Sequence, residues 1–564
     1  MRPLSTSRIS PRVTSAADLA RRGSVAQSSS WRAWFARLVW LIPCGIAAVY
    51  LVVFITQLRH NLWLIGWSSD YSSAFTVPET LIRTGTGGHT VLAPYALYVP
   101  LWFGLLTARL PLHREFWEVS PTLLFVASAL ALGWSVAQVA TRRIALFAVL
   151  IVLVASPWAL STFMAAVDHN TVYPSTALLG VYLIWLARGE GRRRATAFAV
   201  PLLAGIALGT SLASDVLLVP TGIAPLFLTA VLAGTRRDRL SRLVALSALS
   251  TVAVSLPVAW LTSTVMTAQG YRTNALSTGL APLSTLPAHL QLLRDGLERL
   301  FNGYLGNGEP GALHGELGLA CKILMFAALL TLLVTGVRCA TSFVLSGRRA
   351  GHSAPVTKLA LSLHTIYWTG SAAMACGAFL LSGFLDSDHE PFYATVIFSV
   401  AAIVPLFMRS RSPLSWLIPL GASIFFVASA VGVASYPVLP TASLAPYEST
   451  IVRLAREHHV KAGYAGYWDA SGLTWTAHEQ VAVRPVFACS NPGGANLCVF
   501  PQETVASWYI PKREQSFLLV NKTLFSVTSL PAGLGRPIAA YEFGPVQMYI
   551  YSYDIASRLG PAPP

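Results

Sequence analysis

Repeated apolar runs of about 18–22 residues, separated by short polar stretches, constrain this chain more than any other feature. A helix of that length matches the hydrocarbon thickness of a bilayer. Of the 564 residues, 54% are hydrophobic and only 11% are charged, and the mean hydropathy is +0.56. No soluble fold of this length needs so much apolar surface. The sequence therefore predicts an all-α polytopic membrane protein.

The positive charge of the chain lies mostly in short arginine-rich connections between the apolar runs, although the formal net charge of +16 could suggest nucleic-acid binding. Short basic connections stay in the cytoplasm, so membrane topology explains the charge better. The basic connections are at 142–143, 188–194, 236–242, 338–358 and 409–411. This pattern predicts about eleven transmembrane helices, with the N-terminus inside and the C-terminus outside. The spans are expected near 38–58, 119–140, 144–166, 171–187, 195–213, 216–233, 243–265, 318–338, 359–384, 391–408 and 414–435.

Three regions follow from this topology. Residues 1–37 are basic and predict a disordered cytoplasmic tail. Residues 38–436 form the transmembrane domain, with long outer loops at 59–118 and 266–317. Residues 437–564 return to an ordinary globular composition, which predicts a small extracytoplasmic α/β domain. We expect its helix at 446–459 and its strands at 463–468, 480–486, 516–520 and 546–553.

Both outer loops contain stretches that suit a membrane surface. Residues 91–110 are apolar enough to cross, but a crossing would turn the later basic connections outward, so a helix in the outer leaflet is favoured. In the second loop, leucines recur at helical spacing from 286 onward, which predicts an amphipathic interfacial helix. Its polar face is expected to carry His289, Arg294, Asp295, Glu298 and Arg299.

Two cysteines, Cys489 and Cys498, lie in the polar C-terminal region with eight residues between them. This spacing suits a local disulfide. A disulfide there implies an oxidising compartment. The predicted disulfide therefore favours an outward C-terminus independently of the arginine pattern.

Asp70 is the strongest candidate for chemistry, since it follows the first span and opens the first outer loop. A carboxylate close to the bilayer is costly unless it is hydrated, paired or bound to metal, so its presence is a functional hint. Aromatic neighbours, Tyr71 among them, could stack on a sugar. The structural alternatives are a solvated loop aspartate or a cap for a helix that begins near Ser72.

The other polar residues at the outer ends of the spans are weaker candidates. Acidic and imidazole groups could hold a divalent cation or orient a phosphate, but a hydrated turn or a helix cap explains each of them about as well. Arginine and histidine could bind a pyrophosphate or lipid phosphate, with anionic lipid headgroups as the alternative. No nucleotide-binding or hydrolase motif is found. The candidates of these kinds are Arg83, His89, Asp168, His169, Asn170, Asp215, Arg272, Asp386, Asp388 and His389.

The order of these features resembles the GT-C superfamily of polyprenyl-phosphate-dependent glycosyltransferases, particularly its protein-mannosyltransferase and aminoarabinose-transferase branch. The shared pattern is a first span, a long outer loop opening with an aspartate, interfacial helices, paired spans and a trailing outward domain. The residues that carry the likeness are Ala155-Ser-Pro-Trp-Ala159, Asp168-His169, Leu178-Leu-Gly-Val-Tyr182, Gly205-Ile-Ala-Leu-Gly209 and Ser214-Asp215-Val-Leu-Leu-Val-Pro220.

The resemblance implies a fold, an activity and partners. Asp70 would be the catalytic base of an inverting transfer from a polyprenyl-phosphate sugar to an acceptor hydroxyl on the outer face. Asp168 and His169 would hold the phosphate or a divalent cation, Mg²⁺ or Mn²⁺. The acceptor would be a glycan, lipid or protein, and the location a bacterial inner or plasma membrane. A secondary transporter or flippase is the alternative, although acidic groups gathered on one side favour surface chemistry over passage.

Overall fold

The computed structural model describes most of the chain, and the statements below concern that part. The described residues are 40–56, 69–84, 90–92, 106, 113–164, 169, 171–189, 194–273, 279–304, 315–348, 355–383, 390–409, 413–435, 447–489, 497–522, 527, 529–531 and 533–561. The predicted N-terminal tail and nearly all of residues 91–110 lie outside it.

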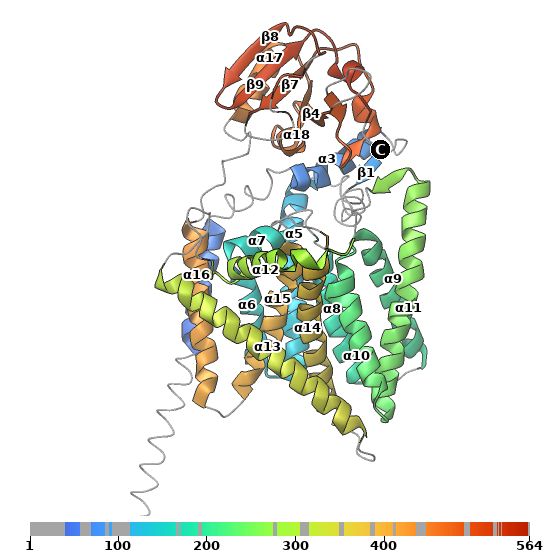
Figure 1. Ribbon diagram of the computed structural model, residues 1–564, viewed down its shortest axis with the longest axis vertical. Coiled ribbons are helices and arrows are strands. Elements are labelled where there is room, and N and C mark those ends of the chain that lie inside the picture. The colour runs from blue at the N-terminus through green and yellow to red at the C-terminus, as the bar shows by residue number, and fades with distance from the viewer. Residues whose placement is uncertain are drawn as a thin grey trace, which may run out of the picture.

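Apolar helices form an elongated bundle with the C-terminal domain at one end (Figure 1). In chain order the helical elements of the bundle are Trp40–Thr56, α5 (His113–Val139), α6 (Arg142–Leu153), α7 (Pro157–Met164), α8 (Val172–Ala187), α9 (Arg194–Ser214), η2 (Val219–Ile223), α10 (Ala224–Gly234), α11 (Arg239–Ala268), η3 (Leu283–Thr285), α12 (Leu286–Leu300), α13 (Glu316–Arg348), α14 (Val356–Leu381), α15 (Glu390–Ile403), η4 (Val404–Arg409), η5 (Pro413–Trp416) and α16 (Leu417–Ser435).

Within the described residues, four helices are long and apolar enough to cross a membrane, or five if the bent pair α6 and α7 counts as one span. Five shorter apolar helices accompany them. The long helices α11 and α13 leave large apolar side chains exposed, Trp260 and Leu330 among them, as lipid contact requires. These are the helices of a multi-pass membrane protein. The number of about eleven spans stays a prediction.

The predicted span at 144–166 is wrong as a single helix. The chain forms α6, breaks, and continues as α7 at an angle of 86°. The break falls before Pro157, which has no N–H to donate and clashes with the preceding turn. Ser156 then caps the new helix, since its Oγ accepts a hydrogen bond from the N–H of Ala159 at 3.1 Å.

The arginine-bearing helix ends share one end of the bundle. Arg236, after α10, donates from Nη1 to the carbonyl of Phe343 near the end of α13 at 3.1 Å. Arg409, at the end of η4, donates to the carbonyl of Val139 at the end of α5 at 2.7 Å. The C-terminal domain lies at the opposite end (Figure 1). The arrangement agrees with the arginine pattern, while the side of the membrane that each end faces stays a prediction.

Helix α12 lies across the end of the bundle nearer the C-terminal domain, but its polar face differs from the predicted one (Figure 1). His289 and Glu298 are buried, whereas Leu290 is exposed. Burial is possible because both side chains find partners: His289 Nδ1 lies 3.0 Å from the carbonyl of Leu380, and Glu298 pairs with Lys322 Nζ at 2.6 Å. Helix packing thus decides which face is covered.

The C-terminal domain is built on a six-stranded mixed sheet of order β5-β4-β3-β7-β9-β8. Alternate residues of β7 face opposite sides of the sheet. Phe517 packs with α17 and α18 on one side, and Leu518 packs on the other side in a cluster that includes η8. The predicted helix and four strands lie close to the observed ones, except that Tyr467 begins α18. The elements are α17 (Glu448–Glu457), β3 (Ala462–Gly466), α18 (Tyr467–Thr476), β4 (Ala482–Ala488), β5 (Leu497–Val499), β6 (Thr504–Val505), η7 (Ala506–Tyr509), β7 (Ser516–Asn521), β8 (Ala539–Phe543), β9 (Val546–Tyr551) and η8 (Ile555–Arg558).

A second, three-stranded sheet ties this domain to the outer loops. Strand β1 (Thr90–Leu92) of the first loop pairs in parallel with β2 (Tyr271–Thr273) of the second loop and antiparallel with β6. Strands from three distant segments therefore share one ladder. Helix α3 (Ser69–Thr84) lies between this sheet, the C-terminal domain and the bundle (Figure 1).

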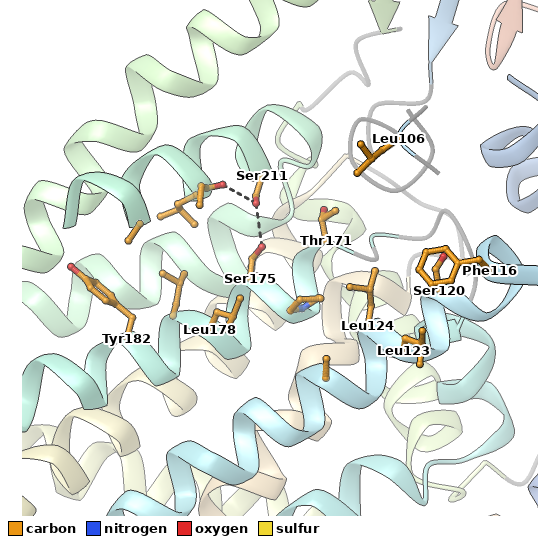
Figure 2. Close-up of a pocket in the computed structure, with 16 residues that line it drawn as sticks. Leu106, Phe116, Ser120, Leu123, Leu124, Thr171, Ser175, Leu178, Tyr182 and Ser211 are labelled. Carbon is orange, nitrogen blue, oxygen red and sulfur yellow. Dashed lines mark hydrogen bonds between the residues drawn. The ribbon is translucent and has the colours of Figure 1, made fainter. Parts of the chain in front are cut away.

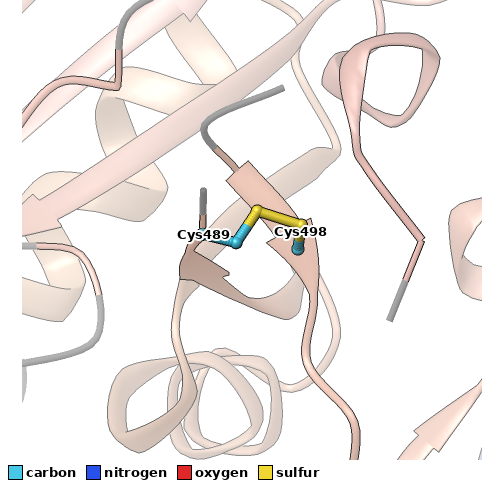
Figure 3. The surroundings of a disulfide bond; sticks show 2 residues. All are labelled: Cys489 and Cys498. Atoms are coloured by element: carbon cyan, nitrogen blue, oxygen red, sulfur yellow. A yellow bond between two sulfur atoms is a disulfide. The ribbon is translucent and has the colours of Figure 1, made fainter. Parts of the chain in front are cut away.

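Cys489 and Cys498 form a disulfide at the edge of the large sheet (Figure 3). It joins the end of β4 to β5, strands that are also paired antiparallel. The other four cysteines, Cys44, Cys321, Cys339 and Cys376, are free.

Candidate functional site

Asp70 is the second residue of α3, in its first turn. The helix begins at Ser69, three residues earlier than the sequence suggested, so Asp70 is inside the helix and does not precede it as a cap. A negative charge in the first turn interacts favourably with the partial positive charge at a helix N-terminus. The side chains of Asp70 and Tyr71 lie outside the described part of the structure.

Helix α3 is fixed by an aromatic stack between the bundle and the C-terminal domain. The Phe75 ring lies 4.7 Å from Trp475 of α18 and 5.7 Å from Trp117 of α5, measured between ring centroids. One turn further on, Trp508 Nε1 donates to Thr80 Oγ1 at 2.9 Å. The helix that carries Asp70 is thus held from both sides.

His169 and Asp215, 46 residues apart in the sequence, meet at the outer ends of α8 and α9. The imidazole Nδ1 of His169 contacts Asp215 Oδ2, and the other carboxylate oxygen accepts a hydrogen bond from the N–H of Leu217 at 2.9 Å. The Asp215 side chain is 2% exposed and that of His169 16% exposed. Asp215 therefore caps a turn, as predicted, and also orients an imidazole. His169 has a φ of 59°, a conformation that is uncommon outside glycine.

A groove of about 830 Å³ runs along the side of the bundle between α5, α8 and α9 (Figure 2). Its wall is almost entirely apolar, and Leu123 and Leu178 stand exposed along it. Hydroxyls are confined to a few positions, including Ser175, whose Oγ donates to Ser211 Oγ at 3.3 Å. The full lining is Leu106, Phe116, Ser120, Leu123, Leu124, Ala127, Thr171, Pro174, Ser175, Leu178, Leu179, Tyr182, Ala204, Ala207, Leu208 and Ser211.

The outer end of the groove adjoins both features described above. Thr171 lines the groove two residues after His169, and Ser211 lines it one helical turn before Asp215, whose N–H bonds to the Ser211 carbonyl at 2.9 Å. Phe116 also lines it, and the next residue, Trp117, stacks on Phe75 of α3. The groove therefore ends beside the His169–Asp215 pair, and its wall helix α5 also packs against α3.

The two described basic candidates differ in their surroundings. Arg83, in the last turn of α3, pairs with Glu79 at 2.7 Å and with Glu479 of the C-terminal domain. Arg272 is exposed at the centre of β2, opposite Val91 of β1. The remaining candidates lie outside the described residues: His89, Asp168, Asn170, Asp386, Asp388 and His389.

The C-terminal domain buries a carboxylate that sequence reasoning did not single out. Burial raises the pKa of Asp469 to about 7, although a hydrogen bond from Asn521 Nδ2 at 3.1 Å acts in the opposite direction. Asn521 belongs to the sequon Asn521-Lys-Thr523, and its side chain is buried. In this fold the amide of the sequon is a structural hydrogen-bond donor.

Sequence reasoning also missed Glu503. Its carboxylate accepts hydrogen bonds from Ser73 of α3 and, at 2.6 Å, from Tyr467 of α18. Nothing near Glu503 in the sequence distinguishes it from a surface acid. The meeting of His169 with Asp215 could have been found, because both residues lie at the same end of neighbouring spans in the predicted topology.

The comparisons with known proteins return few matches. No family model matches the chain, and neither does any curated protein. Two solved structures of an oligosaccharyltransferase from Archaeoglobus fulgidus are similar at 15% identity over 80% of this chain. The apo form has a TM-score of 0.43, and the form tethered to an acceptor peptide with an NVT sequon has 0.42. This chain covers 65% and 64% of their lengths, less than two thirds.

Proposed function

We propose that this protein is a membrane glycosyltransferase of the GT-C type. It moves a sugar from a polyprenyl-phosphate donor to an acceptor hydroxyl on the outer face of the membrane in which it is embedded. One observation carries the proposal: an apolar groove in the side of the helical bundle ends beside the His169–Asp215 pair, and one of its wall helices, α5, also packs against α3. A lipid-linked donor enters from the bilayer and a polar acceptor from water. A site for both must join an apolar groove to polar groups at the membrane surface.

The groove supports a lipid chain by its length and chemistry. Along α8 it extends from Thr171 to Tyr182, which spans about 16 Å at the rise of an α-helix. Its walls offer dispersion contacts and almost no hydrogen-bonding groups, as a hydrocarbon ligand requires. Exposed Leu123 and Leu178 line it on the lipid-facing side of the bundle.

In the proposed reaction Asp70 is the general base. It takes the proton of the acceptor hydroxyl while that oxygen attacks the anomeric carbon of the donor. The bond from the anomeric carbon to the phosphate oxygen breaks as the new glycosidic bond forms, and the polyprenyl phosphate leaves with the electron pair. This single displacement inverts the anomeric configuration. Trp475 and the neighbouring rings support α3, so that Asp70 is held at one place.

We assign Asp168 and His169 to the donor phosphate, with Asp215 fixing the orientation of the imidazole. The described residues hold no group of three or more His, Cys, Asp and Glu side chains suited to a cation, and both oxygens of Asp215 already accept hydrogen bonds. If transfer survives a chelator, the donor phosphate is bound by direct contacts with the protein. If transfer is lost and then restored by Mg²⁺ or Mn²⁺, the phosphate is bound through a cation.

The test uses membranes that contain the full chain and radiolabelled polyprenyl-phosphate sugars, and it follows label from the lipid donor to product. Asp70→Asn should lower transfer by about 10²–10⁴-fold, the range for loss of a general base. Asp295→Asn is the matched control, because Asp295 lies on α12 at the same end of the bundle and pairs with Arg294. Equal transfer by wild type and Asp70→Asn would remove Asp70 from the mechanism. A product that keeps the donor's anomeric configuration would exclude the single displacement.

A further inference from the structure

The C-terminal domain contributes one buried carboxylate to α3, at Glu503. Glu503 is 3% exposed and lies directly before β6, the strand that pairs with β1 of the first outer loop. A buried carboxylate is stable only when it is hydrogen-bonded. Its Oε2 accepts hydrogen bonds from Ser73 Oγ and from Tyr467 OH, the second at 2.6 Å. The two donors come from α3 and from α18, so the carboxylate bridges two elements.

The contact falls close to the residue with the proposed catalytic role. Ser73 follows Asp70 by three positions on α3, and residues so spaced share a face of a helix. Ser73 is itself buried. Glu503 therefore bonds to the face of α3 that bears Asp70, one turn along from it.

The backbone at Glu503 is held in an uncommon conformation. Its φ is 51°, in the left-handed region that disfavours side chains other than glycine, asparagine and aspartate. Such a conformation persists only where surrounding contacts fix it. Here the fixing contacts are the two hydrogen bonds of the carboxylate and the β6–β1 ladder that starts at the next residue.

We propose that Glu503 is a positioning residue through which the C-terminal domain holds the first turns of α3, and with them Asp70, at the outer end of the groove. The contact is buried away from competing water, so it restrains α3 more than an exposed polar contact would. Phe75 and Thr80 hold the helix further along. Glu503 acts on the turn nearest Asp70. The catalytic consequence rests on the proposed function, whereas the restraint on α3 does not.

The restraint is measured by amide hydrogen exchange of the full chain in nanodiscs. Ser73→Ala should raise exchange within residues 69–76 by about tenfold, since one buried hydrogen bond is lost, and Glu503→Ala should raise it at least as much, since it also loses the bond from Tyr467. The double variant should show no increase beyond Glu503→Ala, because that change has already removed the bond from Ser73. Glu503→Gln, which keeps an acceptor oxygen, should recover part of the protection.

The controls separate this role from general unfolding. Amides of β7 and β9 should exchange as in wild type, and Glu542→Gln, which changes an exposed carboxylate of the same domain, should leave α3 unchanged. If Glu503→Ala also loosens β7 and β9, Ser73→Ala carries the test from the other side of the contact. Wild-type exchange in 69–76 for Ser73→Ala and Glu503→Gln alike would overturn the proposal.

The transfer assay adds a readout that a purely structural role would not move. Glu503→Ala should lower kcat several-fold while the KM for the lipid donor stays unchanged, because the groove does not include Glu503. Unchanged kcat with a loosened α3 would overturn the positioning of Asp70. If α3 loosens as expected but wild type transfers no sugar, the proposed function fails and the restraint by Glu503 stands.

Discussion

Asp469 should make the C-terminal domain less stable as the pH rises, opposite to the usual behaviour of a carboxylate. Its side chain is buried, its Oδ2 accepts a hydrogen bond from Asn521, and its Oδ1 has no hydrogen-bond partner among the described residues. Burial disfavours the charged form and raises the pKa to about 7 from the ordinary value of 3.8. The folded state therefore binds a proton that the unfolded state releases between these two values.

The sign and size follow from proton linkage. Where the folded state binds more protons than the unfolded state, the free energy of unfolding falls as the pH rises. The gap between 3.8 and about 7 corresponds to about 4 kcal/mol in full. Between pH 5 and pH 8 the loss should be about 2.5 kcal/mol, with most of it below pH 7 and little further change above pH 8. The full stabilising effect is present only below pH 4, where both states are protonated.

Asp469→Asn should remove this dependence, because the amide has a similar shape and does not ionise. The assay is amide exchange in β7 and β9 of the full chain between pH 5 and pH 8, corrected for the intrinsic exchange rate. Glu542→Gln is the matched control: its exposed carboxylate pairs with Lys522, which lowers the pKa of Glu542 from an ordinary value that already lies below this range. Equal slopes for wild type and Asp469→Asn would refute the reasoning.

Three further predictions concern the proposed site and the topology. Asp215→Ala should lower transfer by about 10–100-fold and the free energy of unfolding by about 1–3 kcal/mol, because it leaves the N–H of Leu217 and the His169 ring without their partner. Unchanged thermal unfolding and unchanged transfer would contradict the role of the His169–Asp215 pair. Leu178→Trp should raise the KM for the lipid donor several-fold with little effect on thermal unfolding, since this exposed side chain lines the groove; an unchanged KM would remove the groove from donor binding. Single cysteines at Gly87→Cys and Arg237→Cys should react with an impermeant thiol reagent from opposite sides of the membrane, and labelling from one side would exclude the predicted topology.

The features that sequence reasoning obtained are those with a local or periodic signal. Each span must be apolar over its whole length, and each short basic connection reports its side, so the helices and their shared arginine end follow from sequence alone. Strand β9 shows alternating burial over most of its length, and four strands of the C-terminal domain were expected near their observed positions. The break before Pro157 was missed although proline was visible there, because the apolar run continues across it.

The site was only partly predictable. His169 and Asp215 were each selected as polar groups at the outer ends of spans, but their contact depends on how α8 packs beside α9. Glu298 was assigned to a polar face because it has the spacing of one; Lys322 of α13 makes its burial possible. Glu503 has no distinguishing neighbours in the sequence, and its partner Ser73 is 430 residues away.

The sequence by itself determined the class of protein and the division into an apolar bundle and a polar C-terminal domain, and it predicted that the candidate acids lie on the opposite side of the membrane from the arginines. The bilayer requires apolar side chains along each span and favours basic residues on one side, so these properties can be read from the composition and from the spacing of apolar runs. Only the tertiary structure decided that α3 lies between bundle and domain, that a groove ends beside the His169–Asp215 pair, and that Glu503 reaches Ser73. These features depend on packing between segments far apart in the chain. The energy of such a contact depends on both surfaces together, so neither local sequence predicts it alone.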